Sequence, residues 1–409
     1  MRKFWLTAVA LLAIGSVCVA AGPQVIRDSI TKSAQFGLNN PSLVYDGVAG
    51  NEALSAAIGS FINACGWFEV RKPGGAEPDY VLKGTASGSR YSLVVLQGGA
   101  TLFQGSFDFK PGMERESAKL AVDAVLRQIF KMHKLKGICN TKIVFCAEVT
   151  KGVRNLYLCD IDGKNVTQLT NYRSLCVEPG WFPDGRSVAY TKYNKSTTDI
   201  LETRIDSRQT RRLASYQGLN VGAAIHPRGN FLALILSLDN QVELYVKALN
   251  SPDKIRLTNS KAVEAAPCWS PDGNNICYVT DENSRVPRLA IINVKDKKPQ
   301  LTSTMTVEAS TPDWSDDNKI VYAAKMGGHY GLAVLDLKDA NSKMTGSVVN
   351  LAGDWESPSW APDNRHVVCV RSYNGKSALY VVDTFTKKAR QLLTYNGNIY
   401  MPAWSPLQQ

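Results

Sequence analysis

Histidine is the side chain that most often carries acid–base or metal chemistry near neutral pH, and this sequence of 409 residues has four. They are His133, His226, His329 and His366, and no two have the spacing of a metal-binding pair. The patterns G-x-S-x-G and H-E-x-x-H, the P-loop and the dinucleotide fingerprint are also missing. We therefore interpret the four histidines as solvated or capping side chains. The sequence predicts no catalytic residue, no metal site and no cofactor.

Cysteine is the other residue type that could carry chemistry, because thiols form disulfides, bind metals and act as nucleophiles. Eight of the nine cysteines lie beyond residue 21, and no two form a C-x-x-C pair: Cys65, Cys139, Cys146, Cys159, Cys176, Cys268, Cys277 and Cys369. Several stand in apolar, strand-like runs, where buried free thiols are the simpler interpretation. The sequence alone leaves their pairing open.

The elements that position these side chains follow a repeat of 44 to 46 residues. Its most regular part resembles "WSPDG", and proline precedes the aromatic residue by two positions in five of six copies. The copies begin at Trp181, Ile225, Trp269, Trp314, Trp360 and Trp404. Proline, aspartate and glycine favour turns, so each copy predicts a tight turn between two strands. The tryptophans are expected to pack between neighbouring repeats.

Each period contains runs for four short strands, which is the pattern of a β-propeller blade. The first copy, at residues 141–170, has three strands and no tryptophan strand, whereas residues 399–409 supply a tryptophan strand alone. Together these two pieces make one blade. We therefore predict an all-β, six-bladed β-propeller over residues 137–409, closed by the C-terminal strand.

Residues 45–136 have a different pattern and predict a small α+β domain before the propeller. Asn51 can cap a helix that Gly66 ends, and a second helix is expected from about Met113 to Lys134. Four strand-like runs lie between the helices. Residues 22–44 are expected to form a flexible N-terminal segment.

The first 21 residues have the order of a secretory signal peptide. A basic pair precedes an apolar stretch at residues 4–14, and small residues follow. We expect export and cleavage near Ala20 or Ala21, and a lipid on Cys18 is the alternative. Cleavage would lower the formal net charge from +11 to +9, because two cations and no acids are removed. An exported chain meets little nucleic acid, so we expect no nucleic-acid partner.

The sequence favours a binding scaffold over an enzyme. A propeller can gate a serine peptidase, but that enzyme needs a catalytic domain of roughly 200 residues or more. The residues before the propeller are too few to hold such a domain. We therefore expect no small-molecule substrate. A propeller-based hydrolase or a sugar-binding module that uses the central channel is the alternative.

The order of these parts resembles the TolB family, the periplasmic component of the Tol-Pal system. The resemblance rests on the signal peptide, the short domain with "PDYVLKG", the junction "KGICNTKIVFCAE" and the six propeller repeats. It implies a non-enzymatic protein of the Gram-negative periplasm, peripheral to the envelope, that supports outer-membrane integrity and constriction at cell division. Eight mature cysteines depart from the usual composition of the family.

The resemblance also implies two protein partners. The peptidoglycan-associated lipoprotein Pal would bind at the propeller mouth. A TolA-like inner-membrane protein would bind the mature N-terminal segment, with contacts from Gln24, Val25, Ile26, Arg27 and Asp28.

The repeat itself places the mouth, because the chain enters each innermost strand from the end with the loops before the tryptophan. Residues shortly before the aromatic positions are therefore predicted to rim it: Glu178, Asn220, Glu264, Glu308, Trp355, Glu356 and Tyr400. The glutamates are either an acidic binding feature in a basic protein or solvated loop ends. Asp184 and Asp272, in the turns after the aromatic positions, are expected on the opposite face.

Overall fold

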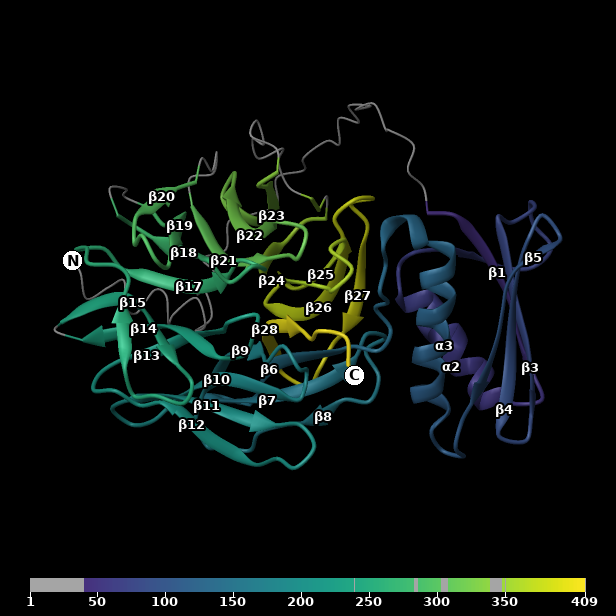
Figure 1. Cartoon of the computed structure of the whole chain (residues 1–409), viewed down its shortest axis with the longest axis horizontal. Coiled ribbons are helices and arrows are strands. Elements are labelled where there is room, and N and C mark those ends of the chain that lie inside the picture. The colour runs from purple at the N-terminus through teal and green to yellow at the C-terminus, as the bar shows by residue number, and fades with distance from the viewer. Residues whose placement is uncertain are drawn as a thin grey trace.

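The protein is described from a computed structural model that covers residues 40–238, 240–282, 286–302, 308–338, 348–349 and 351–408. The predicted signal peptide at residues 1–21, with Cys18, and the segment Gln24–Asp28 lie outside the described residues. The described chain forms a small α+β domain and a β-propeller that lie side by side (Figure 1).

The N-terminal domain is a five-stranded sheet, in the order β2-β1-β3-β4-β5, with two helices between the sheet and the propeller (Figure 1). Its elements are β1 (Ser42–Ala49), α2 (Glu52–Ala64), β2 (Glu69–Arg71), β3 (Tyr80–Ser87), β4 (Arg90–Gln97), β5 (Ala100–Asp108), α3 (Glu114–Ile129) and the 3-10 turn η1 (Lys131–His133). The sheet begins at Ser42, three residues before the predicted start of the domain at residue 45. The end of the segment expected to be flexible is therefore part of β1.

Local sequence signals set the helix ends. The Asn51 side chain accepts a hydrogen bond from the Leu54 backbone N–H at 2.9 Å, and Gly66 follows α2 with a φ of 73°. Both predictions for α2 are confirmed. The second helix ends at Ile129 rather than Lys134, because the chain tightens into η1 and Lys134 takes a left-handed φ of 54°.

The propeller has six blades, each an antiparallel sheet. The strands are given from the channel outward, and blade 5 has three strands within the described residues. Blade 1 is β28 (Asn398–Trp404), β6 (Lys142–Thr150), β7 (Val153–Asp160) and β8 (Thr167–Gln168); blade 2 is β9 (Cys176–Trp181), β10 (Ser187–Tyr193), β11 (Thr198–Arg204) and β12 (Thr210–Ala214); blade 3 is β13 (Asn220–Ile225), β14 (Phe231–Leu238), β15 (Gln241–Ala248) and β16 (Lys254–Arg256); blade 4 is β17 (Glu264–Trp269), β18 (Asn275–Thr280), β19 (Arg288–Asn293) and β20 (Pro299–Leu301); blade 5 is β21 (Ala309–Trp314), β22 (Lys319–Met326) and β23 (His329–Asp336); blade 6 is β24 (Asp354–Trp360), β25 (His366–Tyr373), β26 (Lys376–Asp383) and β27 (Ala389–Leu393).

The C-terminal strand closes the ring, as the repeat pattern predicts. β28 pairs antiparallel with β6, with Asn398 opposite Glu148 and Trp404 opposite Ile143. Blade 1 therefore combines the two ends of the repeat region. The predicted six-bladed propeller is confirmed.

The repeat tryptophans link neighbouring blades. Trp181 Nε1 donates a hydrogen bond to the Ala403 carbonyl oxygen at 2.9 Å, and Trp269 Nε1 donates to the Ala224 carbonyl oxygen at 3.0 Å. Each acceptor stands just before the aromatic position of the preceding blade. Gly273, with a φ of 75°, completes the turn after Trp269. One fragment of the sequence thus makes both a turn and a contact between blades.

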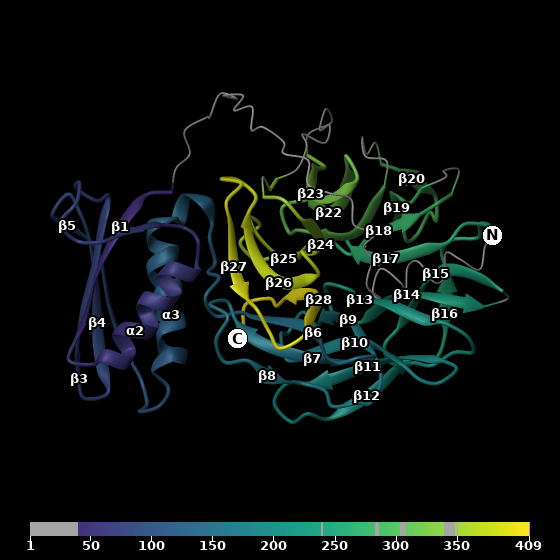
Figure 2. The same ribbon diagram turned by 180° about the vertical axis from the view of Figure 1, so that it is seen from behind.

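The two parts of the chain share a hydrophobic core. Phe61 of α2 and Val122 of α3 belong to the same buried cluster as Phe145 of β6 and Val368 of β25. Seen from behind, the two helices again lie between the N-terminal sheet and blades 1 and 6 (Figure 2). The helices therefore bury one face on the sheet and another on the propeller.

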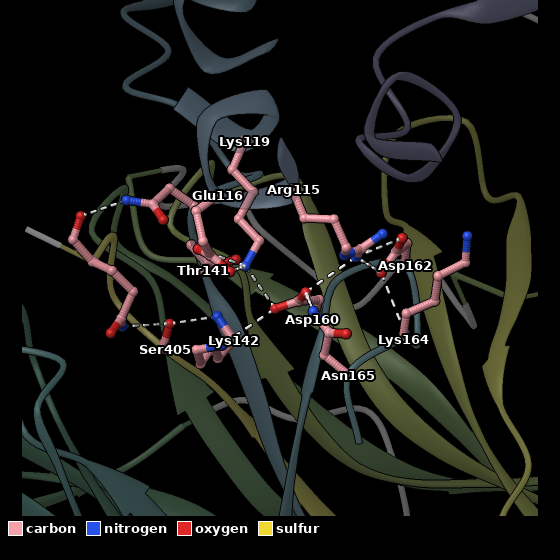
Figure 3. Close-up of polar contacts among 12 residues, drawn as sticks. Arg115, Glu116, Lys119, Thr141, Lys142, Asp160, Asp162, Lys164, Asn165 and Ser405 are labelled. Atoms are coloured by element: carbon pink, nitrogen blue, oxygen red, sulfur yellow. Dashed lines mark hydrogen bonds and ion pairs between the residues drawn. The ribbon is translucent and has the colours of Figure 1, made fainter. Parts of the chain in front are cut away.

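A buried charge cluster connects the same surfaces (Figure 3). The Asp160 carboxylate, at the end of β7, lies 2.8 Å from Lys119 Nζ, 3.1 Å from Arg115 Nη2 and 3.3 Å from Lys142 Nζ. Arg115 Nη2 also lies 2.9 Å from Asp162. Burial alone would raise the pKa of Asp160, but the neighbouring cations, Lys119 first, hold it below its usual value. This cluster holds the turn after β7 against α3.

Candidate binding site in the central channel

A cavity of about 1100 Å³ occupies the centre of the propeller, and the six innermost strands form its wall. It extends from the loops before these strands to the turns that follow them. We call the first end the mouth; residues 308–311, 354–357 and 398–401 surround much of it. The N-terminal domain contacts the other end, where Trp67 Nε1 donates to the Asp363 carboxylate at 3.0 Å.

Every innermost strand has a β-bulge three residues before its aromatic position. The residue at this point has a positive φ in each blade, and all six line the cavity: Glu178, Gly222, Ala266, Thr311, Ser357 and Met401. Five of them precede proline, which has no N–H to give to a strand ladder. A non-glycine residue in this conformation costs on the order of 1–3 kcal/mol, so the surrounding blades must hold it in place.

Glu178 shows how one blade supports the next. Its Oε2 atom accepts hydrogen bonds from the Gly222 backbone N–H and from the Thr191 hydroxyl, both at 2.8 Å. Burial raises the pKa of Glu178, and the two hydrogen bonds oppose part of that rise. The carboxyl group therefore fixes the bulge of blade 3 while it lines the channel.

Four of the seven residues predicted at the mouth line the cavity: Glu178, Glu308, Glu356 and Tyr400. The other three are at most 1% exposed and are packed within the propeller: Asn220, Glu264 and Trp355. For these three the expectation of an exposed rim is corrected by the structure. Each of the three makes a hydrogen bond inside the fold; Trp355 Nε1, for example, donates to the Leu351 carbonyl oxygen at 3.0 Å.

Strand alternation explains this difference. Asn220, Glu264 and Trp355 stand five residues before the aromatic position of their repeats, whereas Glu356 and Tyr400 stand four residues before it. Successive side chains of a strand point to opposite faces of the sheet, so the two sets point toward different neighbouring blades, and the second set lines the cavity. A signal was present in the sequence, because the equivalent residues of the other repeats are apolar and fully buried: Cys176, Ala309 and Ile399.

Asp313 is a channel residue that the sequence reasoning missed. It directly precedes Trp314, at a position where the other repeats have Gly, Ala, Cys or Ser. Its Oδ2 atom accepts a hydrogen bond from the Trp360 backbone N–H at 2.7 Å. Burial raises its pKa to about 6, although hydrogen bonds act in the opposite direction. When the six repeats are aligned, an aspartate at a position that otherwise holds small residues was the signal that could have identified it.

Three acids gather at the mouth between blades 5 and 6. Glu308 accepts a hydrogen bond from the Tyr330 hydroxyl and lies 3.2 Å from Lys325 Nζ. Asp354 accepts a hydrogen bond from the Tyr330 backbone N–H at 2.9 Å. Burial, and then the charge of Asp354, raise the pKa of Glu356 to about 7. Tyr330 therefore joins two of the three carboxylates.

The cavity is acidic although the protein as a whole is basic. Among the described residues, one with a cationic side chain, Lys376, lines it. Seven acidic residues of the same ranges do so: Glu178, Asp281, Glu308, Asp313, Asp316, Asp354 and Glu356. Prolines and tryptophans of the repeats form much of the remaining wall. Such a surface suits a polypeptide segment with basic or amide groups, because the acids attract cations while the rings provide apolar contact.

The histidines lie in different environments. His226 and His366 are only 7% and 2% exposed, so neither is a solvated side chain, whereas the side chain of His329 is 76% exposed. His226 Nδ1 accepts a hydrogen bond from the Arg228 backbone N–H at 3.0 Å, which is a capping contact.

In the part of the chain that the structure describes, no cluster of three or more His, Cys, Asp or Glu side chains could hold a metal ion. Nor does any helix in these ranges have the length and apolar character needed to cross a membrane.

Comparison with known proteins identifies the family. The family model described as the TolB β-propeller domain matches residues 130–408, which is more than half of the chain. The chain belongs to the TolB family. A TolB homolog from Chlorobaculum tepidum is 42% identical over 65 residues, 16% of this chain and 15% of that protein. The Tol-Pal system protein TolB of Actinobacillus succinogenes is 28% identical over 126 residues, 29% of each chain.

These alignments thus cover less than a third of each curated TolB relative. The structural match is more extensive. The crystal structure of TolB from Acinetobacter baumannii superposes with a TM-score of 0.79 at 17% identity, over 90% of this chain and 97% of that one. The protein therefore has the TolB fold.

Proposed function

We propose that this TolB-family protein is a non-enzymatic adaptor of the Tol-Pal system whose propeller mouth binds Pal. In this role it supports outer-membrane integrity and constriction at cell division. The family match supports the proposal, as do relatives named Tol-Pal system protein TolB. The observation that carries it is the acidic channel, because carboxylates beside proline and tryptophan rings can bind a protein segment with basic groups.

The contacts of the channel acids favour binding over catalysis. Glu178 and Asp313 accept hydrogen bonds from backbone N–H groups of neighbouring blades, and Glu308 is engaged by Tyr330 and Lys325. A general acid or base must reach the proton that it transfers. These carboxyl groups instead hold the wall of the channel. A hydrolase or a sugar-binding module remains the second candidate, with the same cavity as its site.

The proposed role places the protein in the periplasm. It includes a signal peptide at residues 1–21, cleaved near Ala20 or Ala21, and a mature segment, Gln24–Asp28, that binds a TolA-like protein. The sequence pattern and the family support these two points. Sequencing of the mature N-terminus should give Ala21 or Gly22. A retained Met1 or a lipid on Cys18 would contradict the proposed cleavage.

Calorimetry with purified Pal tests the proposed function. The variant Glu308→Gln/Asp354→Asn removes two charges at the mouth, and the introduced glutamine amide oxygen can still accept the Tyr330 hydrogen bond. Glu264 is unsuitable for this purpose because it is buried. We expect Pal binding to weaken by roughly 0.5 to 2 kcal/mol, with a smaller difference at high salt.

Asp184→Asn is the matched control, since Asp184 is exposed in the turn of blade 2 at the other end of the channel. Its affinity for Pal should equal that of the unaltered protein. Equal affinity of all three proteins would contradict binding at the acidic mouth. No binding of Pal, together with binding of an oligosaccharide, would favour the second candidate.

A further inference from the structure

Two cysteines stand opposite each other in blade 4. Cys268 in β17 and Cys277 in β18 are direct partners in the antiparallel ladder. Opposite residues of such a ladder have Cα atoms about 4.5 to 5.5 Å apart, and disulfides join residues whose Cα atoms are about 4.4 to 6.8 Å apart. The backbone therefore already holds the two residues at a separation that a disulfide can span.

The two side chains also point to the same side of the sheet. Both are buried in the cluster between blades 4 and 5, with Ile320 and Tyr322 of the next blade. Both thiols are free in the structure. Burial raises the pKa of Cys268 well above its usual value, and the neighbouring Cys277 thiol raises it further. The two sulfur atoms are thus neighbours in one apolar environment.

No other described cysteine has a cysteine opposite it in a strand ladder. Cys369 faces Tyr380, and Cys159 faces Ile143. Cys146 and Cys176 lie in different blades, and Cys65 and Cys139 lie outside the strands. Among the described cysteines, the ladders therefore place one pair directly opposite each other, a distinction that the spacing in the sequence does not make.

We propose that Cys268 and Cys277 form a disulfide bond in the exported protein. The two thiols give up two protons and two electrons and one S–S bond forms between them. The disulfide bond of an oxidant, either a protein or a small molecule, accepts the two protons and two electrons and is reduced to two thiols. This step rests on the proposed export, because an oxidising compartment supplies such a disulfide.

The position of the bond indicates what it stabilises and at which stage of folding it forms. It joins the innermost strand of blade 4, whose bulge at Ala266 lines the channel, to the strand behind it. Thiolates attack disulfides, and a buried thiol with a raised pKa is seldom a thiolate. The bond therefore forms while β17 and β18 pair, before blade 5 covers the two sulfur atoms.

The test begins with the full chain exported in a Gram-negative host. Free thiols are trapped with an alkylating agent in acid, and the protein is cut before Asp253, Asp272 and Asp281. Without reductant, mass spectrometry should find the peptide 253–271 linked to 272–280, and alkylation at the other six mature cysteines. Full alkylation of both Cys268 and Cys277, or a bond from either to another cysteine, would overturn the proposal.

A second measurement does not depend on the compartment. The purified chain is refolded in a glutathione redox buffer, and the bond should raise the melting temperature by about 2 to 6 °C relative to the reduced protein. The variant Cys268→Ala/Cys277→Ala should lose this response to reductant, whereas Cys369→Ala, a buried thiol with no cysteine opposite, should keep it. Refolded protein without the bond would overturn the proposal. Free thiols in the protein from the host would overturn the proposal in either case. If the refolded protein then has the bond, the failure lies in the proposed export and not in the pairing of the two cysteines.

Discussion

At the scale of single residues, the Glu264 carboxyl group shows how burial changes the chemistry of an acid. Ser260 holds it beside Glu243: the Ser260 hydroxyl donates to Glu264 and the Ser260 backbone N–H donates to Glu243, both at 2.9 Å. Arg256 lies 2.7 Å from Glu243. Burial, and then the Glu243 charge, raise the pKa of Glu264 from its ordinary 4.5 to about 8. The folded protein therefore binds a proton at neutral pH that the unfolded chain releases.

This difference predicts a stability that falls with pH. The contribution of Glu264 is complete below about pH 4.5 and is lost as the pH rises through 8, since the folded state binds more protons in that interval. Glu264→Gln should therefore be more stable than the unaltered protein at pH 9, by roughly 1 to 3 kcal/mol, and should lose this advantage at pH 5. Urea unfolding of both proteins at pH 5 and pH 9 measures this difference in the free energy of unfolding. Glu77→Gln, at an exposed position, is the control and should show no such change.

At the scale of elements, the innermost strands are shaped by their bulges. Gly222 occupies the bulge of blade 3, where a Cβ atom would lie 3.1 Å from Pro267 Cδ, and Ala266 occupies the bulge of blade 4 with a φ of 46°. Glycine adopts this conformation without strain, whereas alanine does not. Replacing glycine by alanine at residue 222 and alanine by glycine at residue 266 should therefore have opposite effects on stability.

Gly222→Ala should lower the free energy of unfolding by about 1 kcal/mol or more, and Ala266→Gly should raise it by about 0.5 to 1 kcal/mol. Thermal midpoints of the two variants, measured under the same conditions, provide the comparison. If both variants were destabilised to the same extent, backbone strain would not be the property that these positions share.

The bulges also mark the limit of prediction from sequence. Turn residues and tryptophans recur in the printed chain, so the number of blades and the closing strand could be predicted from them. A positive φ at Ala266 or Met401 could not be predicted from the sequence, because these residue types do not favour it and only contacts with neighbouring blades impose it. The same holds for the site: Glu356 and Glu264 look alike in sequence, and a one-residue difference in register sends one to the channel and the other between blades.

At the scale of the whole molecule, the ring is closed by its last strand. β28 supplies the innermost strand of blade 1, and the Ala403 carbonyl oxygen accepts the hydrogen bond of Trp181 from blade 2. Removal of residues 399–409 would expose the edge of β6 and break this contact with blade 2. The shortened chain should melt well below the full chain, or without a cooperative transition, in a thermal scan followed by circular dichroism. Melting at the same temperature would mean that the ring does not depend on this strand.

The N-terminal domain leaves the mouth of the channel accessible because it packs on the other end of the blades. Trp67 contacts Asp363 there, and Arg115 and Lys119 contact Asp160. A partner can therefore approach the acidic mouth while both domains stay in contact. This arrangement makes the location of the partner a property that can be measured on the intact protein.

Hydrogen–deuterium exchange of the full chain, with and without purified Pal, tests the central claim most directly. We predict that Pal slows exchange at residues 308–311, 354–357 and 398–401, around the mouth, and leaves the turns at residues 183–185 and 271–273 unchanged. Protection confined to those turns or to the N-terminal domain, with no change around the mouth, would contradict the account.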